Sequence, residues 1–200
     1  MKILIVSGPT REPLDAVRYI SNYSTGTLGK YLAAAAKKRG HRVTCIECPT
    51  QAETARELKN LLRTLAPRHE VLIMPAAVCD VRPAKVAADK IKKNKLSTIS
   101  LVKNPDVLAG LAKNKKPGQI FIGFALESSK ILKNGFGKLQ NKNLDFIVVQ
   151  KVTSKVRPFG DKPIEATILR RDGQIKHHKA ISKKKLSENL IKEAEKAFFD

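Results

Sequence analysis

The 200-residue sequence contains no tryptophan, few aromatic residues (5%) and only three cysteines. It is also poor in acidic residues, because 18 Asp and Glu stand against 39 Lys and Arg, which gives a formal net charge of +21. A positive field of this size attracts phosphates, nucleic acids or anionic surfaces, so it indicates the sign of a partner but not its identity. The 42% of hydrophobic residues excludes a disordered polymer and predicts one domain spanning residues 1–200.

The three cysteines, Cys45, Cys48 and Cys79, are an odd number without a second CxxC pair, which excludes a disulfide framework and a four-cysteine zinc site. The apolar stretch RVTCIEC favours buried strand cysteines over a redox pair at Cys45 and Cys48. The four histidines show no ligand spacing. There is no secretion signal and no apolar run of membrane-spanning length. We therefore expect a cytoplasmic protein without a membrane partner.

Short apolar runs alternate with helical patterns along most of the chain. The apolar runs predict strands at 2–8, 41–48, 70–78, 119–126 and 144–150. The helical patterns cover 25–39, 53–66, 105–113, a stretch ending near 140, and 182–199. This alternation is typical of βαβ units, and it predicts an α/β, Rossmann-like fold with a mostly parallel sheet and helices on both faces. EATILRR and QIKHHKA flank Asp172-Gly173, which predicts a C-terminal β-hairpin.

A long, glycine-free, basic segment follows the third predicted strand, and we expect a mobile basic loop at about 81–97. It contains Lys90, Lys92, Lys93 and Lys95 within six residues. Lysine ammonium groups suit a triphosphate or a departing pyrophosphate, whereas a reader of bases would favour arginine. The alternative for this run taken alone is a solvated charged loop.

The stretch AVRYISNYSTGTLGK precedes a predicted helix and follows the first strand. Ligands of open parallel sheets bind beyond the carboxyl ends of the strands, and a helix N-terminus attracts phosphate. Ser24, Thr25 and Gly26 therefore form either a phosphate cradle or an ordinary N-cap, two readings that the segment alone leaves equal. Neither GxGxxG nor GxxxxGK[ST] occurs, which disfavours a nicotinamide-dependent reductase.

Six sequence blocks carry a more specific signal than any single motif. They are SGPTREPLDAVRYISNYSTG, PAAVCDVRP, KIKK, VKNPDVLAGLA, GFALES and KNLDFIVV. In this order and spacing, from about residue 2 to the end, they resemble the phosphopantothenate cysteine ligase (phosphopantothenoylcysteine synthetase) family of coenzyme A biosynthesis. The resemblance implies a ligase that activates phosphopantothenate with CTP and Mg²⁺ as an acyl-cytidylate, releases pyrophosphate, and passes the acyl group to L-cysteine with loss of CMP.

The resemblance also implies a homodimer with shared active sites. It is to the free-standing form of the family, so we expect no flavin and a separate phosphopantothenoylcysteine decarboxylase as a partner. CTP and ATP cannot be distinguished from first principles, and the magnesium ligands are unknown. A nucleic-acid-binding module is the alternative suggested by the charge, but aromatic residues are scarce and no nucleic-acid-binding motif appears.

The family's functional positions are carried over from matching motifs. Asn22 matches the residue that handles the acyl nucleotidylate, Lys90 the lysine that forms it, and Arg18 an arginine of the substrate site; we expect these three to be catalytic. Substrate binding is expected of Arg18, Asn22 and Ala77. Nucleotide binding is expected of Ser24, Thr25, Gly26, Met74, Pro75, Ala76, Asp80, Lys90, Asn104, Pro105, Asp106, Val107, Phe124, Lys138 and Lys142.

Three positions depart from the family pattern. Thr25 stands where serine is common, which keeps the hydroxyl and adds a methyl group. Cys79 and Leu126 stand where alanine is usual, and Leu126 should alter the local shape of the pocket while Glu127 stays in place.

Overall fold

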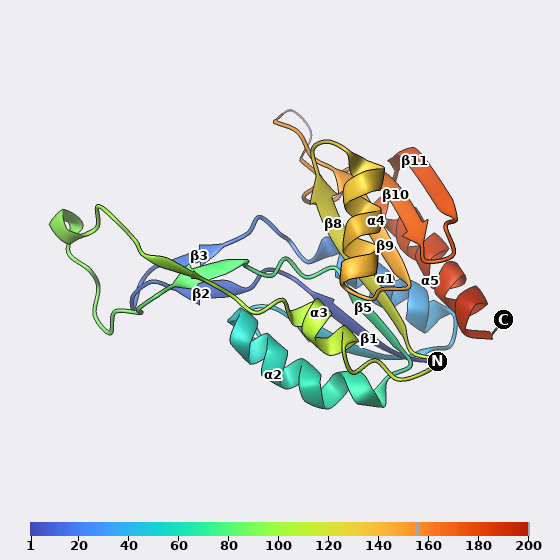
Figure 1. Cartoon of the computed structure of the whole chain (residues 1–200), viewed down its shortest axis with the longest axis horizontal. Helices are drawn as coiled ribbons and strands as arrows, with labels where there is room; N and C mark the ends of the chain where they lie inside the picture. The colour runs from blue at the N-terminus through green and yellow to red at the C-terminus, as the bar shows by residue number, and fades with distance from the viewer. Residues whose placement is uncertain (155–156, 200) are drawn as a thin grey trace.

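The computed structural model describes residues 1–154 and 157–199, and it is built around a seven-stranded sheet with helices on both faces (Figure 1). In spatial order the strands are β11 (Ile175–Ile181), β10 (Ile164–Arg170), β9 (Phe146–Lys151), β8 (Ile120–Glu127), β5 (Val71–Met74), β1 (Lys2–Ser7) and β4 (Arg42–Glu47). From β4 to β9 neighbouring strands are parallel, and β10 pairs antiparallel with both β9 and β11. The predicted mostly parallel sheet and C-terminal hairpin are confirmed.

Strand β1 shows why both faces of the sheet must be covered. Successive side chains point to opposite faces, so Ile3 and Ile5 join one apolar cluster while Leu4 and Val6 join the other. All four are almost completely buried. A strand that is apolar on both sides belongs in the middle of a parallel sheet between two layers of helices.

Five helices form those two layers. They are α1 (Thr27–Lys38), α2 (Ala55–Leu65), α3 (Val107–Ala112), α4 (Ile131–Asn141) and α5 (Lys183–Phe199). Leu32 of α1 and Leu190 of α5 pack in one cluster, and Leu58 of α2 and Leu139 of α4 pack in the other. Short 3₁₀ turns occur at η1 (Ala66–Arg68) and η2 (Lys93–Lys95). No helix of the described residues is long and apolar enough to cross a membrane.

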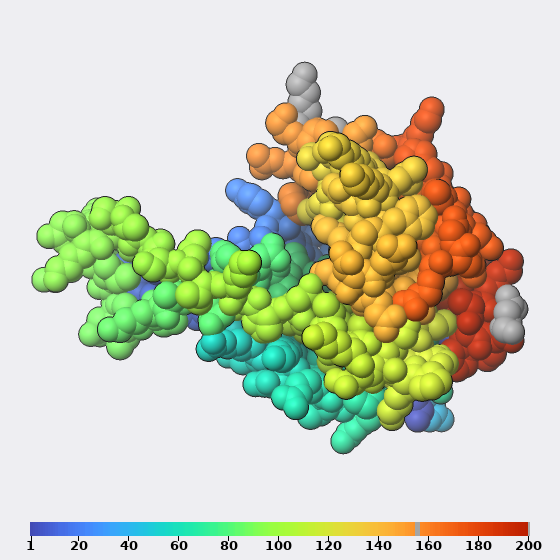
Figure 2. Space-filling view, viewed as in Figure 1, coloured from blue at the N-terminus to red at the C-terminus, as the bar shows by residue number. Residues whose placement is uncertain are grey.

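Two small antiparallel sheets form an arm that projects from the body of the molecule (Figures 1 and 2). The strand β2 (Arg11–Pro13) pairs with β3 (Tyr19–Ser21), and β6 (Val81–Pro83) pairs with β7 (Leu101–Lys103). We define the arm as residues 11–21 and 81–103. The sequence pattern predicted only loops here, because strands of three residues are too short for an alternating pattern to reveal them.

The third predicted strand ends earlier than its sequence suggests. The prediction covered 70–78, but β5 ends at Met74, and the chain then turns toward the end of β1. The amide of Ala77 donates to the carbonyl of Gly8 (2.9 Å), and the amide of Thr10 donates to the carbonyl of Ala77 (3.2 Å). After a break at Pro75 and Ala76, Ala77 thus resumes the parallel pairing with the chain beyond β1, as an isolated bridge to Pro9.

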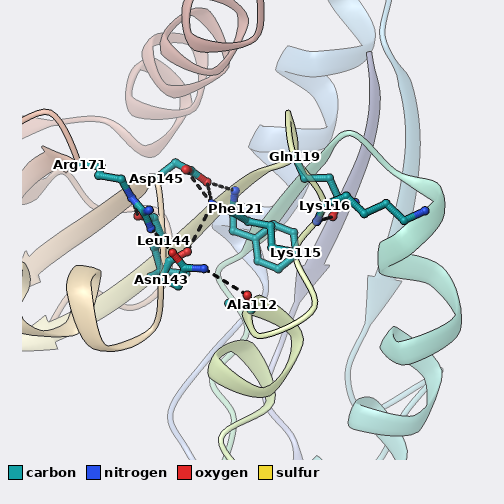
Figure 3. A network of polar contacts seen from close by, with 9 residues as sticks. All are labelled: Ala112, Lys115, Lys116, Gln119, Phe121, Asn143, Leu144, Asp145 and Arg171. Atoms are coloured by element: carbon teal, nitrogen blue, oxygen red, sulfur yellow. Dashed lines mark hydrogen bonds and ion pairs between the residues drawn. The ribbon is translucent and has the colours of Figure 1, made fainter.

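A polar network holds the opposite edge of the sheet, at the amino ends of β8 and β9 (Figure 3). Asp145 accepts from Lys115 Nζ (2.8 Å) and from the amide of Phe121 (2.7 Å). Arg171 donates to the side-chain oxygen of Asn143 (2.6 Å). These bonds fasten the start of β9, so Asn143 and Asp145 of the KNLDFIVV block are structural.

The two cysteines of the CxxC stretch are free thiols, with Cys48 buried and Cys45 half-buried. Burial raises the pKa of Cys48 to about 11, and burial also raises the pKa of Cys45. Because the thiolate is the reactive form, neither residue is activated for redox chemistry, in agreement with the favoured reading of buried strand cysteines.

Candidate functional site

A cleft of about 550 Å³ lies at the carboxyl ends of four neighbouring parallel strands. Ser7 of β1, Met74 of β5, Phe124 of β8 and Gln150 of β9 all line it. The helix that follows β1, α1, covers one face of the sheet. The helix that precedes β5, α2, covers the other face. Open α/β sheets bind ligands at such a switch point between their two helical layers.

The N-terminus of α1 opens into this cleft. Its N-cap is Gly26, whose φ of 68° is left-handed, and no side chain caps the helix. Thr25 instead pairs its hydroxyl with that of Thr27 (2.7 Å), and the hydroxyl of Ser24 accepts weakly from the amide of Gly26 (3.4 Å). The ordinary Ser or Thr N-cap is therefore wrong, and the first amides of α1 present their partial positive charge to the cleft.

Two glycines outside the predicted set of site residues allow close packing at the end of β1, Gly29 between α1 and Ser7 and Gly8 beside Cys48, which follows β4. A Cβ atom on Gly29 would lie 2.2 Å from Cβ of Ser7. A Cβ atom on Gly8, whose φ is +81°, would lie 2.1 Å from the carbonyl oxygen of Cys48. The spacing Gly26-x-x-Gly29 was the available signal, since in dinucleotide-binding turns a glycine at this spacing permits close packing of helix on strand.

Two lysines of the α4 region line the cleft and form ion pairs with acidic side chains. Lys138 pairs with Glu127 (2.6 Å), and Lys142 pairs with Asp106 (2.9 Å). Burial alone would raise the pKa of Glu127, but hydrogen bonds from Lys138 and Asn134 lower it below its usual value. In the Lys142–Asp106 pair both side chains are partly exposed, and such pairs contribute only about 0–1 kcal/mol.

Two asparagines fix the backbone that leaves β5. The side-chain nitrogen of Asn22 donates to the carbonyls of Val78 (3.1 Å) and Ala77 (3.4 Å). The side-chain nitrogen of Asn104 donates to the carbonyl of Cys79 (2.9 Å). The amide of Asn22 is thus held at the mouth of the cleft, with its orientation set by the chain it contacts.

Nearly all the predicted site residues come together in this cleft. Its lining includes Asn22, Ser24, Thr25, Gly26, Met74, Pro75, Ala76, Ala77, Asp80, Asn104, Pro105, Asp106, Val107, Phe124, Lys138 and Lys142. Two predicted residues, Arg18 and Lys90, lie on the arm and do not line the cleft.

Arg18 contacts the basic loop of the arm. Its guanidinium donates to Asp15 (3.0 Å from Nε) and to the carbonyl of Ile91 (2.8 Å). Asp15 in turn accepts from the amide of Ile91 (3.0 Å). Arg18 and Asp15 therefore bind the backbone of Ile91, the residue that follows Lys90 in the loop.

One wall of the cleft consists of residues that were not predicted from the sequence, namely Tyr23, Pro158, Phe159 and Lys183. The rings of Tyr23 and Phe159 lie 5.8 Å apart, and the guanidinium of Arg157 lies 5.7 Å from the centre of the Tyr23 ring. These residues come from three distant parts of the chain, and the segment between β9 and β10 has no periodic pattern. No sequence signal pointed to this wall.

Among residues 1–154 and 157–199, no group of three or more His, Cys, Asp and Glu side chains is arranged to hold a metal ion. Magnesium in nucleotide sites is usually held by one or two carboxylates together with substrate phosphates. Asp80 lies exposed in the lining and is a carboxylate suited to that role. The residues present fit an ion that arrives with a triphosphate.

The family model described as "DNA/pantothenate metabolism flavoprotein C-terminal domain" matches residues 1–198. The chain belongs to this family. Two curated relatives carry the name coenzyme A biosynthesis bifunctional protein CoaBC. The one from Escherichia coli K12 is 38% identical over 80% of this chain and 43% of its own length, and the one from Borreliella burgdorferi is 36% identical over 96% and 51%.

The chain thus spans about half the length of the curated relatives it matches. Among solved structures, the crystal structure of the C-terminal domain of the CoaBC protein superposes with a TM-score of 0.79 at 27% identity. That match covers 98% of this chain and 94% of the other. The family expected from the six sequence blocks is confirmed, and the similarity lies in one domain of the bifunctional relatives.

Proposed function

We propose that this protein is a phosphopantothenate cysteine ligase that uses a nucleoside triphosphate to join phosphopantothenate to L-cysteine. The observation that carries the proposal is the cleft itself, in which the uncapped N-terminus of α1, the lysines of the α4 region and Asn22 converge at the switch point. Membership in the pantothenate family and the similarity to the C-terminal domain of CoaBC support it.

The reaction consists of two substitutions. The phosphopantothenate carboxylate attacks the α-phosphorus of the nucleotide, and the bond to pyrophosphate breaks. The cysteine amine then attacks the acyl carbonyl, loses a proton, and displaces the nucleoside monophosphate. Magnesium, bound with the triphosphate, would neutralise phosphate charge.

Different groups of the protein have different roles in this reaction. The amides at the start of α1 bind phosphate, and Lys138 and Lys142 exchange their carboxylate partners for phosphate oxygens. Lys90 stabilises the charge of departing pyrophosphate, a contact that can contribute about 3 kcal/mol in a closed site. Asn22 orients the acyl group without competing as a nucleophile.

We propose CTP as the nucleotide, a preference that rests on the family resemblance. The backbone of Met74 to Ala76 and the ring of Phe124 form the part of the cleft that would contact the base. Turnover with CTP and ATP is to be compared side by side in the presence of phosphopantothenate, cysteine and Mg²⁺. Release of CMP and pyrophosphate is expected; absence of product with both nucleotides would refute the ligase.

We further propose a homodimer in which the arm completes the site of the second copy. Arg18 and Lys90 both belong to the arm, where Arg18 binds the carbonyl of Ile91 next to Lys90, and neither lines the cleft of its own chain. A projecting arm that carries a required lysine fits a site built from two chains. In a symmetric dimer each arm would reach the cleft of its partner.

Mixing two inactive variants tests the shared site. Asn22→Asp removes a cleft residue and should let the acyl-cytidylate accumulate, and Lys90→Gln removes an arm residue and should prevent its formation. If the arm acts on the partner, random mixing gives half mixed dimers with one intact site each, and activity returns to about a quarter of the wild-type value. If Lys90 acts within its own chain, every site stays defective and the mixture remains inactive.

The decarboxylase activity and flavin of bifunctional relatives are not part of this proposal. We propose that phosphopantothenoylcysteine passes to a separate decarboxylase. The proposal of a separate decarboxylase rests on the resemblance of the six sequence blocks to the free-standing form of the family. Incubation of the purified protein with its own product should release no carbon dioxide.

A further inference from the structure

Lys183 is a buried lysine at a position that the helix itself does not favour. It is the first residue of α5 and is 5% exposed. A cation at a helix N-terminus is opposed by the helix dipole. The cap is supplied by Ser182, whose hydroxyl accepts from the amide of Lys185 (3.2 Å), so Lys183 is not needed to start the helix.

The ammonium group of Lys183 is compensated by backbone carbonyls. Its Nζ donates to the carbonyl of Pro158 (2.8 Å) and to that of Gly160 (2.5 Å). The ion pairs among the described residues do not include it, and Asp161 acts only through space. Burial lowers the pKa of this lysine, because removal from water disfavours the charged ammonium group. The buried ammonium group of Lys183 therefore relies on these two carbonyls as acceptors, and its hydrogen bonds hold the segment 158–161 against α5.

A second bond fastens the same segment to the same helical layer. The hydroxyl of Tyr31, on α1, donates to Asp161 (2.8 Å). Residues 158–161 are thus attached to α5 through Lys183 and to α1 through Tyr31. Between the two carbonyls that bind Lys183 stands Phe159, so fixing those carbonyls fixes the direction in which this ring leaves the backbone.

The ring of Phe159 packs on Tyr23, and the two rings form the wall of the cleft that was not predicted from the sequence. Tyr23 is 74% exposed and belongs to the loop that leads into the phosphate-binding end of α1. We propose that Lys183 is a positioning residue, which fastens the segment 158–161 so that Phe159 and Tyr23 close the cleft over the bound phosphorylated substrates. This inference rests on the proposed function for its kinetic effect, but its structural part is independent of turnover.

The absence of tryptophan allows a direct test of the position of residue 159. In a Phe159→Trp protein the new residue is the only tryptophan, and its quenching by acrylamide reports exposure. Adding Lys183→Met, which keeps the chain length and removes the donors, should raise the quenching constant about two-fold or more. Lys184→Met is the matched control, because Lys184 is the exposed next residue of α5, and it should leave quenching unchanged.

Kinetics of the single variants, without the tryptophan, complete the test. Lys183→Met should raise KM for CTP or phosphopantothenate up to about tenfold, with kcat within about two-fold, because one aromatic wall is lost and the reacting groups remain. Should Lys183→Met fail to fold, Tyr31→Phe removes the second fastening and should change quenching and KM in the same direction by less.

Unchanged quenching and unchanged KM in folded Lys183→Met would overturn the inference, as would an equal effect of Lys184→Met. A Lys183→Met protein that only unfolds at lower temperature, with native KM values, would also contradict it. If the wild-type protein turns over none of the substrates, the ligase is refuted, while the quenching measurement still decides whether Lys183 fixes Phe159.

Discussion

At the scale of single residues, Gly29 shows how closely α1 must approach β1 for the cleft to exist. An alanine there would bring its Cβ to 2.2 Å from Cβ of Ser7, a side-chain atom that cannot move without its backbone. We predict that Gly29→Ala lowers the free energy of unfolding by about 1–3 kcal/mol through overpacking. It should also weaken CTP binding, because the amides at the helix start are displaced. Urea unfolding and equilibrium CTP binding measure the two effects.

Gly137→Ala provides the control for Gly29→Ala. Gly137 also lies within a helix, and nothing stands within 4 Å of its ideal Cβ. Alanine should stabilise this helix by about 0.5–1 kcal/mol, since glycine is a poor helix former. Equal destabilisation by both substitutions would contradict the packing argument.

The residue types of the site were readable from the sequence, but their roles as caps or ligands were not. Ser24 and Thr25 are ordinary capping residues, and the sequence left this reading equal to a phosphate cradle. The left-handed Gly26 starts the helix without a side-chain cap, which rules out the ordinary cap, and the phosphate cradle stays a prediction. A backbone angle at one glycine depends on its packing, which a single sequence does not contain.

At the scale of elements, Asp15 fixes the basic loop of the arm. Its carboxylate accepts from the backbone amides of Val17, Arg18 and Ile91 and pairs with the guanidinium of Arg18. We predict that Asp15→Ala speeds hydrogen exchange of the Ile91 amide about tenfold or more, because the acceptor of that amide is lost. Asp89→Ala, which removes an exposed acid of the same loop, should leave the exchange unchanged.

The same bond sets a pH dependence for the arm. The hydrogen bond from the Arg18 side chain, joined by backbone amides and opposed by burial, holds the pKa of Asp15 well below its usual 3.8. A carboxylate with a lowered folded-state pKa contributes stability above its unfolded pKa and loses it as pH falls toward the folded value. Protection of the Ile91 amide should therefore be constant from pH 8 to about 5 and decline only below about pH 4. Loss of protection near neutral pH would contradict this account.

Long elements were predictable, and the arm was not. The periodic patterns of α2 and β8 found these elements within about two residues, because their burial is repeated over several turns or pleats. The strands β2, β3, β6 and β7 have three residues each, and the arm forms only where the β2–β3 pair meets the β6–β7 pair, about 70 residues further along the chain. For the same reason, the sequence placed Arg18 and Lys90 in the site but could not show that they lie on the arm.

At the scale of the whole molecule, the formal net charge of +21 is much larger than the cleft requires. Such a field steers anionic ligands toward the protein and is screened by salt over about 8 Å at physiological ionic strength. It acts on encounter rates and not on bound contacts. The kinetic effect of the overall charge should therefore be separable by experiment from the effect of the lysines that line the cleft.

Three exposed lysines of α5, Lys184, Lys192 and Lys196, allow that separation. Reversing all three to glutamate lowers the formal net charge from +21 to +15, since each reversal subtracts two. We predict that kcat/KM for CTP falls about two- to five-fold at low salt and equals the wild-type value at high salt, with kcat unchanged. Lys142→Gln should instead raise KM at every salt concentration, because it removes the phosphate contact proposed for Lys142. A steady-state salt titration distinguishes the two, and a salt-independent defect in the α5 variant would show that its lysines act by contact and not by steering.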